Sequence, residues 1–325
     1  MNSVDHRLCV APMLDWTDRH CRYFLRLFSP RLLLYTEMIV AQAVLRGDRA
    51  RLLGFDPAEH PLALQLGGAD PARLAAAAAL GAAAGYDEVN LNVGCPSDRV
   101  QNASFGACLM ARPALVAECI RAMRAAVAVP VTVKCRTGID ELDHWEFLRD
   151  FVAEVAAAGC ATFIVHARKA VLADLSPKEN REVPPLDHAR VWRLKREFPA
   201  LTIIVNGGLR SVAQVAVQLG QVDGVMLGRE AYHNPYVLAD LHRAIFADGF
   251  EPPAPAAVVR AMQEYAERQV ASGTPLRAIT RHLLGLFSGR PGARAWRHAL
   301  TEGASRPGAT PALLAAALVS ATTRG

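Results

Sequence analysis

The sequence predicts a TIM (β/α)8 barrel followed by a small C-terminal all-helical domain, and three observations lead to this fold class. Eight short, largely apolar segments recur within residues 1–248. Helical patterns separate these segments, which is the alternation expected of repeated strand and helix units. After a proline-rich linker at residues 249–255, consecutive amphipathic helices follow. A doubly wound sheet is the alternative, but it rarely needs eight repeats, and no Gly-rich turn follows the first segment.

The eight predicted strands are short, and several are apolar at every position. Continuous apolar runs are typical of parallel strands that helices cover on both faces. Aromatic residues make up only 6% of the chain, so the core is expected to be mainly aliphatic. The predicted strands are Leu8–Val10, Leu32–Tyr35, Leu62–Leu66, Glu88–Leu91, Val131–Val133, Thr162–Val165, Leu201–Val205 and Gly224–Leu227.

Helical patterns lie between the strands, and a glycine follows three of them. Gly85, Gly159 and Gly220 stand where a helix C-cap is expected, because glycine tolerates the left-handed backbone found there. Residues 168–185 show no convincing helix, and such long loops in compact domains are usually functional or disordered. The clearest barrel helices are predicted at Pro71–Ala84, Pro113–Ala126, His144–Ala158 and Ser211–Leu219.

Residues 249–325 are predicted to form a helical domain after a barrel at residues 1–248. Residues 250–325 hold nine Arg, no Lys and four acidic residues, whereas residues 1–249 hold 27 basic and 27 acidic residues. The net charge of +5 therefore comes from the C-terminal quarter. This asymmetry suggests a polyanionic partner, and a solvated Arg-rich surface is an equal alternative on charge alone. The predicted helices are Ala256–Ser272, Leu276–Phe287, Gly292–Leu300 and Thr310–Ala321.

Cysteine usage and the N-terminal segment bear on the compartment. The seven cysteines form no C-x-x-C pair, so neither a zinc site nor a thioredoxin-like site is predicted. Their odd number favours reduced thiols in the cytoplasm. Neither a signal peptide nor an apolar run long enough to span a bilayer is visible. We therefore expect a cytoplasmic protein without a bound metal, and nothing indicates an obligate protein partner.

Each predicted strand ends on a residue with useful chemistry. In a barrel these ends converge on one face, where active sites lie. A lone His after a strand is usually a core residue, but eight such ends in series indicate a site. The residues are Pro12, Met13 and Leu14, then Glu37, Gln65, Asn92 to Cys95, Lys134, His166 with Arg168, Asn206, Gly207 and Gly208, and finally Gly228 with Arg229.

The loops after the last two predicted strands suit a phosphate group. The pair Gly207-Gly208 and the pair Gly228-Arg229 stand where TIM barrels usually bind phosphate. Glycine lets backbone N–H groups approach phosphate oxygens, and arginine adds a bidentate cation. Tight turns are the alternative. Lys134 could face an anionic ring, or it could pair with a carboxylate such as Glu37 or Glu88.

Cys95 stands in the run N-L-N-V-G-C-P-S at residues 90–97. Gly94 allows a tight turn, and Pro96 keeps Cys95 out of the helical region. A free cysteine usually just packs in a core, but this polar turn at a strand end places the thiol for chemistry.

Three long motifs resemble the tRNA-dihydrouridine synthases. They are NLNVGCPSDRVQNASFGACLM at residues 90–110, APMLDWTDRHCRYFLRLFSPRLLLYTEM at residues 11–38, and LSPKENREVPPLD at residues 175–187. The last two are similar to the A-type branch in particular, and the resemblance covers nearly the whole chain. It implies bound FMN and NADPH, or NADH, as electron donor. The implied FMN residues are Pro12, Met13, Leu14, Gln65, Lys134, His166, Asn206, Gly207, Gly208, Gly228 and Arg229.

Reduction of the C5=C6 bond of uracil needs a hydride and a proton. The resemblance implies that FMN supplies the hydride to C6, and a thiol that is protonated at neutral pH can supply the proton to C5. We therefore predict Cys95 as the general acid. The resemblance also points to Asn92 and Arg168 as groups that hold the uracil, while His166 is expected to contact either flavin or uracil.

A base inside a duplex cannot reach such a site, so the uridine must leave its stack while a second surface holds the RNA. Arg294 and Arg297 lie three residues apart, and therefore on one face of a predicted helix. Lys178 and Arg181, also three apart, lie in the long loop. Solvated side chains would be the default for each, but the A-type resemblance implies that both pairs bind tRNA.

The main prediction is an FMN- and NADPH-dependent reductase of tRNA uridines, and the resemblance implies U20 and U20a of the D-loop. A flavin barrel that acts on free pyrimidines or dihydroorotate is one alternative, but it gives the basic C-terminal segment no purpose. A tRNA-binding protein without activity is another, but it gives Cys95 no purpose. Asp15, Asp18 and Glu37 are expected to form structural ion pairs with Arg19, Arg22 or Arg99 rather than to take part in catalysis.

Overall fold

The computed structural model describes residues 4–97, 105–173 and 175–323, so residues 98–104 of the motif at 90–110 lie outside the described residues. The barrel strands are β1 (Leu8–Val10), β2 (Leu34–Tyr35), β4 (Leu62–Gly67), β5 (Glu88–Val93), β6 (Val131–Arg136), β7 (Thr162–His166), β8 (Thr202–Asn206) and β9 (Gly224–Leu227). They are parallel, in the order β1-β9-β8-β7-β6-β5-β4-β2.

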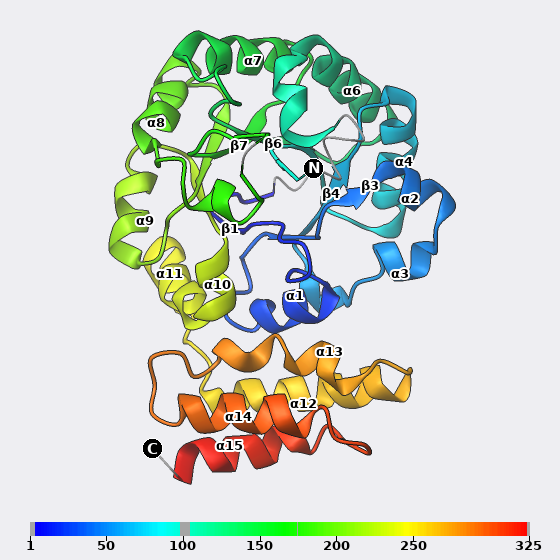
Figure 1. Ribbon diagram of the computed structural model, residues 1–325, viewed down its shortest axis with the longest axis vertical. Coiled ribbons are helices and arrows are strands. Elements are labelled where there is room, and N and C mark those ends of the chain that lie inside the picture. Colours follow the sequence, from blue (N-terminus) through cyan, green and yellow to red (C-terminus); the bar gives the residue numbers. More distant parts are fainter. Residues whose placement is uncertain (1–3, 98–104, 174, 324–325) are drawn as a thin grey trace.

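The barrel closes between β1 and β2. Cys9 pairs with Leu33 there in parallel. Backbone hydrogen bonds of 3.0 Å join Leu33 N–H to Leu8 O and Val10 N–H to Leu33 O. With helices outside this closed sheet, the predicted TIM barrel is confirmed (Figure 1).

Five strands run further than predicted, β4, β7 and β8 by one residue each and β5 and β6 by two and three residues. β5 continues past Leu91 to Val93, and β6 continues past Val133 to Arg136. Their added residues alternate between the barrel interior and the helical layer, and the interior accepts polar side chains because neighbouring strands supply hydrogen-bond partners. A short strand that was not predicted, β3 (Ile39–Val40), pairs with the end of β4.

Helices surround the sheet (Figure 1). Four of them match the predicted ranges within one residue at each end, and Gly85 and Gly159 have the left-handed φ values of 104° and 97° expected at a C-cap. Gly220 follows its helix with φ −73°. The helices are α1 (Arg19–Arg26), α2 (Ala41–Arg46), α3 (Arg49–Leu53), α4 (Pro71–Ala84), α6 (Pro113–Ala126), α7 (Trp145–Ala157), α8 (His188–Glu197), α9 (Val212–Leu219), α10 (Arg229–His233) and α11 (Tyr236–Phe246), with 3-10 turns η1 (Pro57–Glu59), η2 (Gly106–Ala111) and η3 (Glu179–Arg181).

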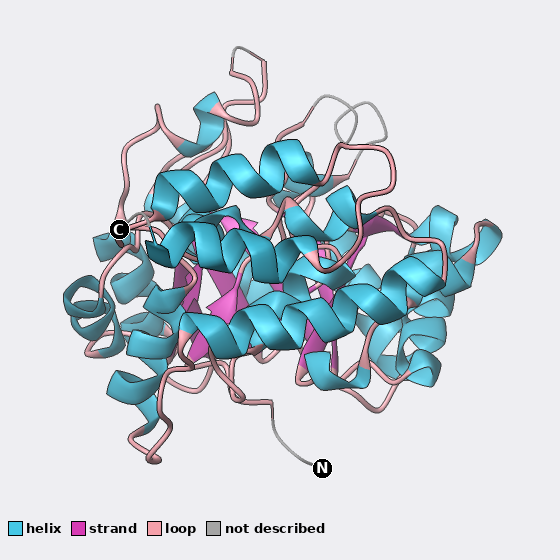
Figure 2. Cartoon of the chain, turned by 90° about the horizontal axis from the view of Figure 1, so that it is seen from below, coloured by secondary structure: helices cyan, strands magenta, loops and turns pink. Residues whose placement is uncertain are grey.

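The C-terminal helices pack together against one side of the barrel (Figures 1 and 2). They are α12 (Pro255–Ala271), α13 (Leu276–Thr280), the turn η4 (Leu283–Gly285), α14 (Ala293–Gly303) and α15 (Leu313–Thr323). Trp296 is fully buried among them and donates its indole N–H to Leu283 O at 2.8 Å. In the part of the chain that the structure describes, no helix has the length and apolar character needed to cross a bilayer.

The predicted helix at 276–287 is interrupted after Thr280 because the chain there docks onto the barrel. Asp18 pairs with Arg281 at 2.7 Å and with the buried His282 at 3.0 Å. Tyr265 of α12 lies 2.7 Å from His20 Nδ1. These directional contacts hold the helical domain in one orientation beside α1.

Candidate active site at the barrel mouth

The barrel register brings the predicted strand-end residues together around one mouth. Asn92 is paired with Lys134, Arg136 with His166, and His166 with Asn206 on successive strands. These side chains point into the barrel, because residues two apart along a strand share a face. The convergence predicted from the sequence is therefore present in the fold.

The turn that carries Cys95 is held by hydrogen bonds on both sides. Asn92 Oδ1 accepts from the backbone N–H of Gly94 at 3.1 Å and of Cys95 at 2.9 Å. The Cys95 carbonyl accepts from Ala107 N–H at 2.9 Å. The thiol is half-buried, with Sγ 3.5 Å from Ser97 Oγ. A fixed and partly accessible thiol is the arrangement that a proton donor requires.

Arg136 is a buried arginine that was not among the predicted residues. Its Nε donates to Gly94 O at 2.9 Å, and its Nη1 donates to Lys169 O and to Asn180 O, both at 3.0 Å. It thereby joins the turn before Cys95 to the long loop after β7. Its position two residues beyond Lys134, on the same face of β6, was the signal in the sequence.

The pKa values of Lys134 and His166 are both lowered at this site. Burial, and then the neighbouring Arg136, lower the pKa of Lys134 to about 8. Lys134 Nζ donates to Asn206 Oδ1 at 3.2 Å and has no ion pair with Glu37 or Glu88. Burial, followed by the charges of Arg136 and Lys134, places the pKa of His166 well below its usual value, so the imidazole is neutral at pH 7.

Five cations surround the mouth, and they have little negative charge to balance them. Within the described residues, only Arg229 among them forms an ion pair, with Glu182. The mutual influence of these charges lowers the pKa values of Arg168 and Arg181, after burial as the first cause. A site with this excess of positive charge suits an anionic ligand. The cations are Lys134, Arg136, Arg168, Arg181 and Arg229.

Two of the three glycines at the mouth stand where a side chain would not fit. Gly207 and Gly208 have left-handed φ values of 119° and 74°. A Cβ on Gly207 would lie 2.9 Å from the His166 ring, and one on Gly208 would collide with Leu186. Around Gly228 the nearest atom to an added Cβ is 3.8 Å away, in Met13. Met13 and Gly228 are thus neighbours at the mouth.

The predicted cofactor residues differ in which hydrogen-bonding groups remain available to a ligand. Met13 N–H is already bonded to Thr17 Oγ1 at 2.9 Å, so that amide is not available to a ligand. Leu14 is 68% exposed beside it. Asn206 uses both ends of its amide, because its Nδ2 donates to Met226 O at 2.8 Å and its Oδ1 accepts from Lys134. Gln65 is fully buried.

The unassigned acids have structural partners. Glu37 accepts a hydrogen bond from the N–H of Asp15, which has a left-handed φ of 64°. Burial raises the pKa of Glu37. Asp18 pairs with Arg281 and His282 at the domain interface rather than near the mouth. Asp18 therefore forms a structural ion pair, but not with Arg19 or Arg22 as predicted, and Arg99 lies outside the described residues. Glu37 braces a backbone turn instead.

Asn180 shapes the long loop after β7. It is fully buried, accepts from Val171 N–H at 2.8 Å, and donates to Val171 O and Leu175 O at 2.8 Å. Lys178 and Arg181 on either side of it are exposed. The loop is therefore an ordered platform in its described part, with its basic side chains turned outward.

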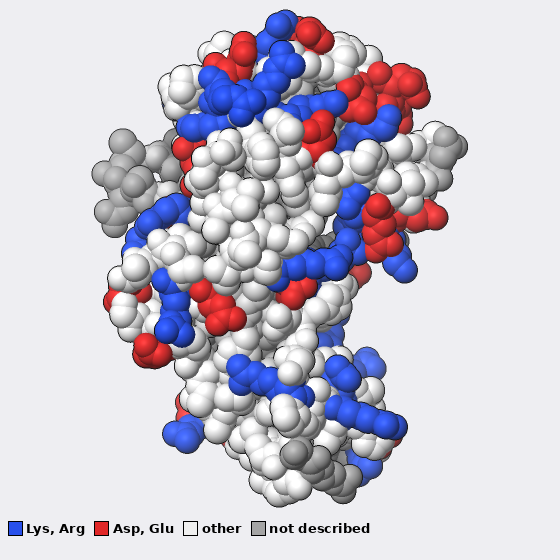
Figure 3. Space-filling view, turned by 90° about the vertical axis from the view of Figure 1, so that its left-hand side faces the viewer, with Lys and Arg blue, Asp and Glu red and all other residues white. Residues whose placement is uncertain are grey.

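Arg168 and the arginines of α14 lie where a long ligand could reach them. Arg168 donates to the backbone carbonyls of Glu182 and Pro184. Arg294 and Arg297 are both exposed, on either side of the buried Trp296. Blue side chains outnumber red ones on the C-terminal helices at the bottom of Figure 3, whereas the two are interspersed on the barrel above.

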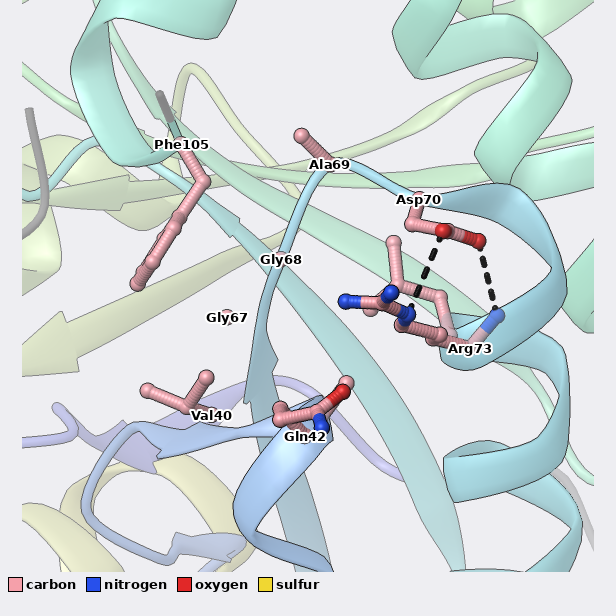
Figure 4. A pocket seen from close by; sticks show the side chains of 10 residues that line it. Val40, Gln42, Gly67, Gly68, Ala69, Asp70, Arg73 and Phe105 are labelled. Carbon is pink, nitrogen blue, oxygen red and sulfur yellow. Dashed lines mark hydrogen bonds and ion pairs between the residues drawn. The ribbon is translucent and has the colours of Figure 1, made fainter. Parts of the chain in front are cut away.

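A cavity of about 350 Å³ lies beside the mouth rather than in it. Figure 4 shows Phe105 on one side of it and Gln42, Asp70 and Arg73 on the other. None of the predicted site residues lines this cavity. Phe105, which lines this cavity, lies two residues before Ala107, whose N–H is bonded to the Cys95 carbonyl.

Comparisons with known proteins show which family the chain is similar to. The family model described as dihydrouridine synthase (Dus) matches residues 9–322. A tRNA-dihydrouridine(20/20a) synthase of Escherichia coli (strain K12) is 59% identical over 93% of this chain and 88% of its own length. Proteins with the same name from Xanthomonas axonopodis pv. citri (strain 306) and Vibrio cholerae serotype O1 are each 57% identical, over 98% and 93% of this chain and 95% and 93% of their own lengths.

One solved structure shows the fold alone. A 2-naphthoyl-CoA reductase in complex with 2-naphthoyl-CoA matches with a TM-score of 0.53 and 14% identity. The match covers 72% of this chain and 49% of that chain.

Proposed function

The chain belongs to the dihydrouridine synthase family, and on that premise we propose that it reduces U20 and U20a in the D-loop of tRNA to 5,6-dihydrouridine. The observation that carries the proposal is the half-buried Cys95 thiol, held on a braced turn beside a glycine-lined, positively charged mouth. Three relatives that match most of the chain are named tRNA-dihydrouridine(20/20a) synthase, after this activity.

The mouth fits FMN, the cofactor that the family implies. Lys134 is a partly buried cation without a carboxylate partner among the described residues, which suits an anionic ring or phosphate. Gly207 and Gly208 have space only for hydrogen, and Arg229 can exchange Glu182 for a phosphate. The residues proposed to hold FMN are Pro12, Met13, Leu14, Gln65, Lys134, His166, Asn206, Gly207, Gly208, Gly228 and Arg229.

When bound, FMN supplies the hydride that adds to C6 of the uracil, after NADPH, or NADH, has reduced the flavin. Cys95 Sγ–H gives its proton to C5, and the thiolate then recovers a proton from water. The balance is uridine, NADPH and a proton giving dihydrouridine and NADP+. Asn92 and Arg168 are proposed to hold the uracil, and the neutral His166 adds no positive charge that would attract the hydride.

Recognition of tRNA is proposed to use two surfaces. Lys178 and Arg181 project from the loop beside the mouth, and Arg294 and Arg297 project from α14. We propose residues 1–248 as the catalytic unit and residues 249–325 as the unit that grips the RNA backbone. Two separated contacts are needed because the target base must be held while it is out of its stack.

The first test follows the colour of the purified full-length protein. We expect it to be yellow, to bleach with NADPH in the absence of oxygen, and to recover its colour when tRNA lacking dihydrouridine is added. Recovery with a free pyrimidine but not with tRNA would support the free-pyrimidine reductase instead. A colourless protein that still binds tRNA would support the non-enzymatic alternative.

The same preparation tests Cys95. Cys95→Ala should bind FMN and accept electrons from NADPH, but form dihydrouridine at least about 100-fold more slowly, the usual effect of losing a general acid. Cys108→Ala is the matched control, because Cys108 is also half-buried and lies nearby in the chain. Normal product formation by Cys95→Ala would remove the role assigned to the thiol.

A further inference from the structure

Glu88 is a fully buried carboxylate that the proposed reaction does not use. Its Oε1 accepts hydrogen bonds from the hydroxyls of Tyr35 at 2.8 Å and Thr132 at 2.6 Å, and its Oε2 lies 2.6 Å from His6 Nε2. Burial lowers the pKa of His6, but Glu88 raises it, and the net shift is upward. Each oxygen of Glu88 thus has a hydrogen-bond partner inside the barrel.

From Glu88 a line of side-chain hydrogen bonds runs across three neighbouring strands toward the mouth. Thr132 Oγ1 on β6 accepts from Asn90 Nδ2 at 2.8 Å. Asn90 Oδ1 on β5 accepts from Gln65 Nε2 on β4 at 2.8 Å. Gln65 Oε1 accepts from Asn92 Nδ2 at 2.9 Å. The line ends at the turn that Asn92 holds.

The chemistry of Glu88 decides the direction of each link. The Oε1 atom of Glu88 accepts from both hydroxyls, so Thr132 donates its single proton to it. The Thr132 oxygen can then only accept from its other neighbour, which requires the NH2 group of Asn90. Asn90 is left with its carbonyl for the next link, which requires the NH2 group of Gln65. The carbonyl of Gln65 then faces Asn92.

The opposite end of the line independently requires the same direction. The backbone N–H groups of Gly94 and Cys95 can only donate, so Asn92 directs its oxygen at them and its NH2 group at Gln65. Had the two ends disagreed, a buried pair would face donor to donor. Because they agree, the carboxylate and the turn together hold three amides in one orientation.

This orientation determines what Asn92 can offer a ligand. Its oxygen accepts two backbone hydrogen bonds, and one of its two N–H groups is bonded to Gln65. The remaining N–H can only donate, and Asn92 is 8% exposed at the mouth. A carbonyl oxygen of uracil accepts such a bond, whereas the amino group of cytosine would meet it donor to donor.

We propose that Glu88 is a positioning residue, which acts through Thr132 and Asn90 to set the orientation of Gln65 and Asn92 at the active site. The proposal rests on the proposed function, because Gln65 is taken to contact FMN and Asn92 to contact the uracil. It also implies that Asn92 contributes to the choice of uridine over cytidine as a pure donor.

Two buried hydroxyls provide the test. Thr132→Val removes the link between Glu88 and Asn90, while Tyr35→Phe removes a hydroxyl bond to the same Glu88 oxygen but lies off the line. We expect Thr132→Val to raise the FMN dissociation constant of the full-length protein roughly fivefold, the effect of one net hydrogen bond. Tyr35→Phe should leave that constant unchanged, although both variants lose stability to urea.

Kinetics separate positioning from a general loss of structure. Thr132→Val should lower kcat for tRNA while KM changes little, because the proposed phosphate contacts lie on other elements. Thr132→Ser, which keeps the hydroxyl, should restore both the FMN affinity and kcat. Asn90→Ala breaks the middle link and should behave like Thr132→Val, which covers the case of a Val variant that does not fold.

The outcomes distinguish this inference from the proposed function. If Thr132→Val and Asn90→Ala bind FMN and turn over as Tyr35→Phe does, the positioning role of Glu88 is wrong. If the unaltered protein neither binds FMN nor reduces tRNA, the proposed function is wrong instead.

Discussion

Lys134 carries its charge inside the barrel with an amide oxygen as its hydrogen-bond partner. Burial, and then Arg136, lower its pKa to about 8, so the ammonium is present at pH 7 and largely lost by pH 9 in the protein without ligand. An anionic ligand beside it is therefore bound more tightly at the lower pH. The neighbouring His166 stays neutral over this range.

FMN affinity should consequently depend on pH through Lys134. From pH 7 to pH 9 we expect the FMN dissociation constant to rise, with a midpoint near the pKa of about 8 and a limiting slope of about tenfold per pH unit. Lys134→Met should bind FMN more weakly at pH 7 and show a flat profile. Fluorescence quenching of FMN measures both, and identical profiles for the two proteins would exclude Lys134 as the titrating group.

Asp18 shows how one side chain serves two elements. Its Oδ1 caps α1 by accepting from His20 N–H and Cys21 N–H, both at 3.0 Å, and its Oδ2 pairs with Arg281 and His282. Burial raises the pKa of Asp18. The hydrogen bond and the charge of His282, together with the cap, lower this pKa by more than burial raises it, so the net shift is downward. Helix α1 and the C-terminal helices thus share one carboxylate.

Asp18→Asn should separate the two roles, because asparagine is also a good N-cap but carries no charge. We expect the free energy of unfolding to fall by roughly 1–3 kcal/mol at pH 7, the usual cost of losing a buried charged hydrogen bond. A depressed carboxyl pKa stabilises the fold above the ordinary value of about 4 and loses this effect below it. The difference in the free energy of unfolding between the unaltered protein and Asp18→Asn should therefore become smaller below pH 4. Urea denaturation at pH 7 and pH 3.5 tests this, and an equal difference at both values would contradict it.

At the scale of the whole molecule, the fold places a basic helical domain beside an electropositive mouth. The contacts of Asp18 and Tyr265 hold the two parts together, so the exposed arginines of α14 keep a defined relation to the mouth. This arrangement suits an RNA that is held at its backbone while one base enters the barrel.

Replacement of Arg294 and Arg297 by Ala should weaken tRNA binding and make it less dependent on salt. The slope of the logarithm of the binding constant against the logarithm of the salt concentration should become shallower by roughly 0.7–0.9 for each lost phosphate contact. FMN binding should not change, because both side chains are exposed on α14. The matched control is Arg260→Ala with Arg277→Ala, which removes the same charge from exposed positions on α12 and α13. Equal effects of the two double variants across several salt concentrations would argue against a specific contact.

Part of this molecule followed from local sequence pattern. The alternation of apolar segments and helical periods predicted the barrel, and the strand ends predicted that Asn92, Lys134 and His166 meet. Both inferences depend on short-range periodicity, which a chain expresses wherever it folds. The polar alternation E-V-N-L-N-V of β5 is also visible in the sequence, but a largely apolar strand was predicted there, and the hydrogen bonds of Glu88 inside the barrel were not.

The sequence by itself determined the succession of strands and helices and the residues at the strand ends, because each depends on neighbours a few positions away. Only the tertiary structure decided which side chains become partners over long distances. Arg136 reaches the carbonyl of Gly94, Asp18 pairs with Arg281, and Thr132 donates to the side chain of Glu88 on the neighbouring strand. Such pairings arise when the closed barrel brings distant segments into contact, and no local pattern encodes them.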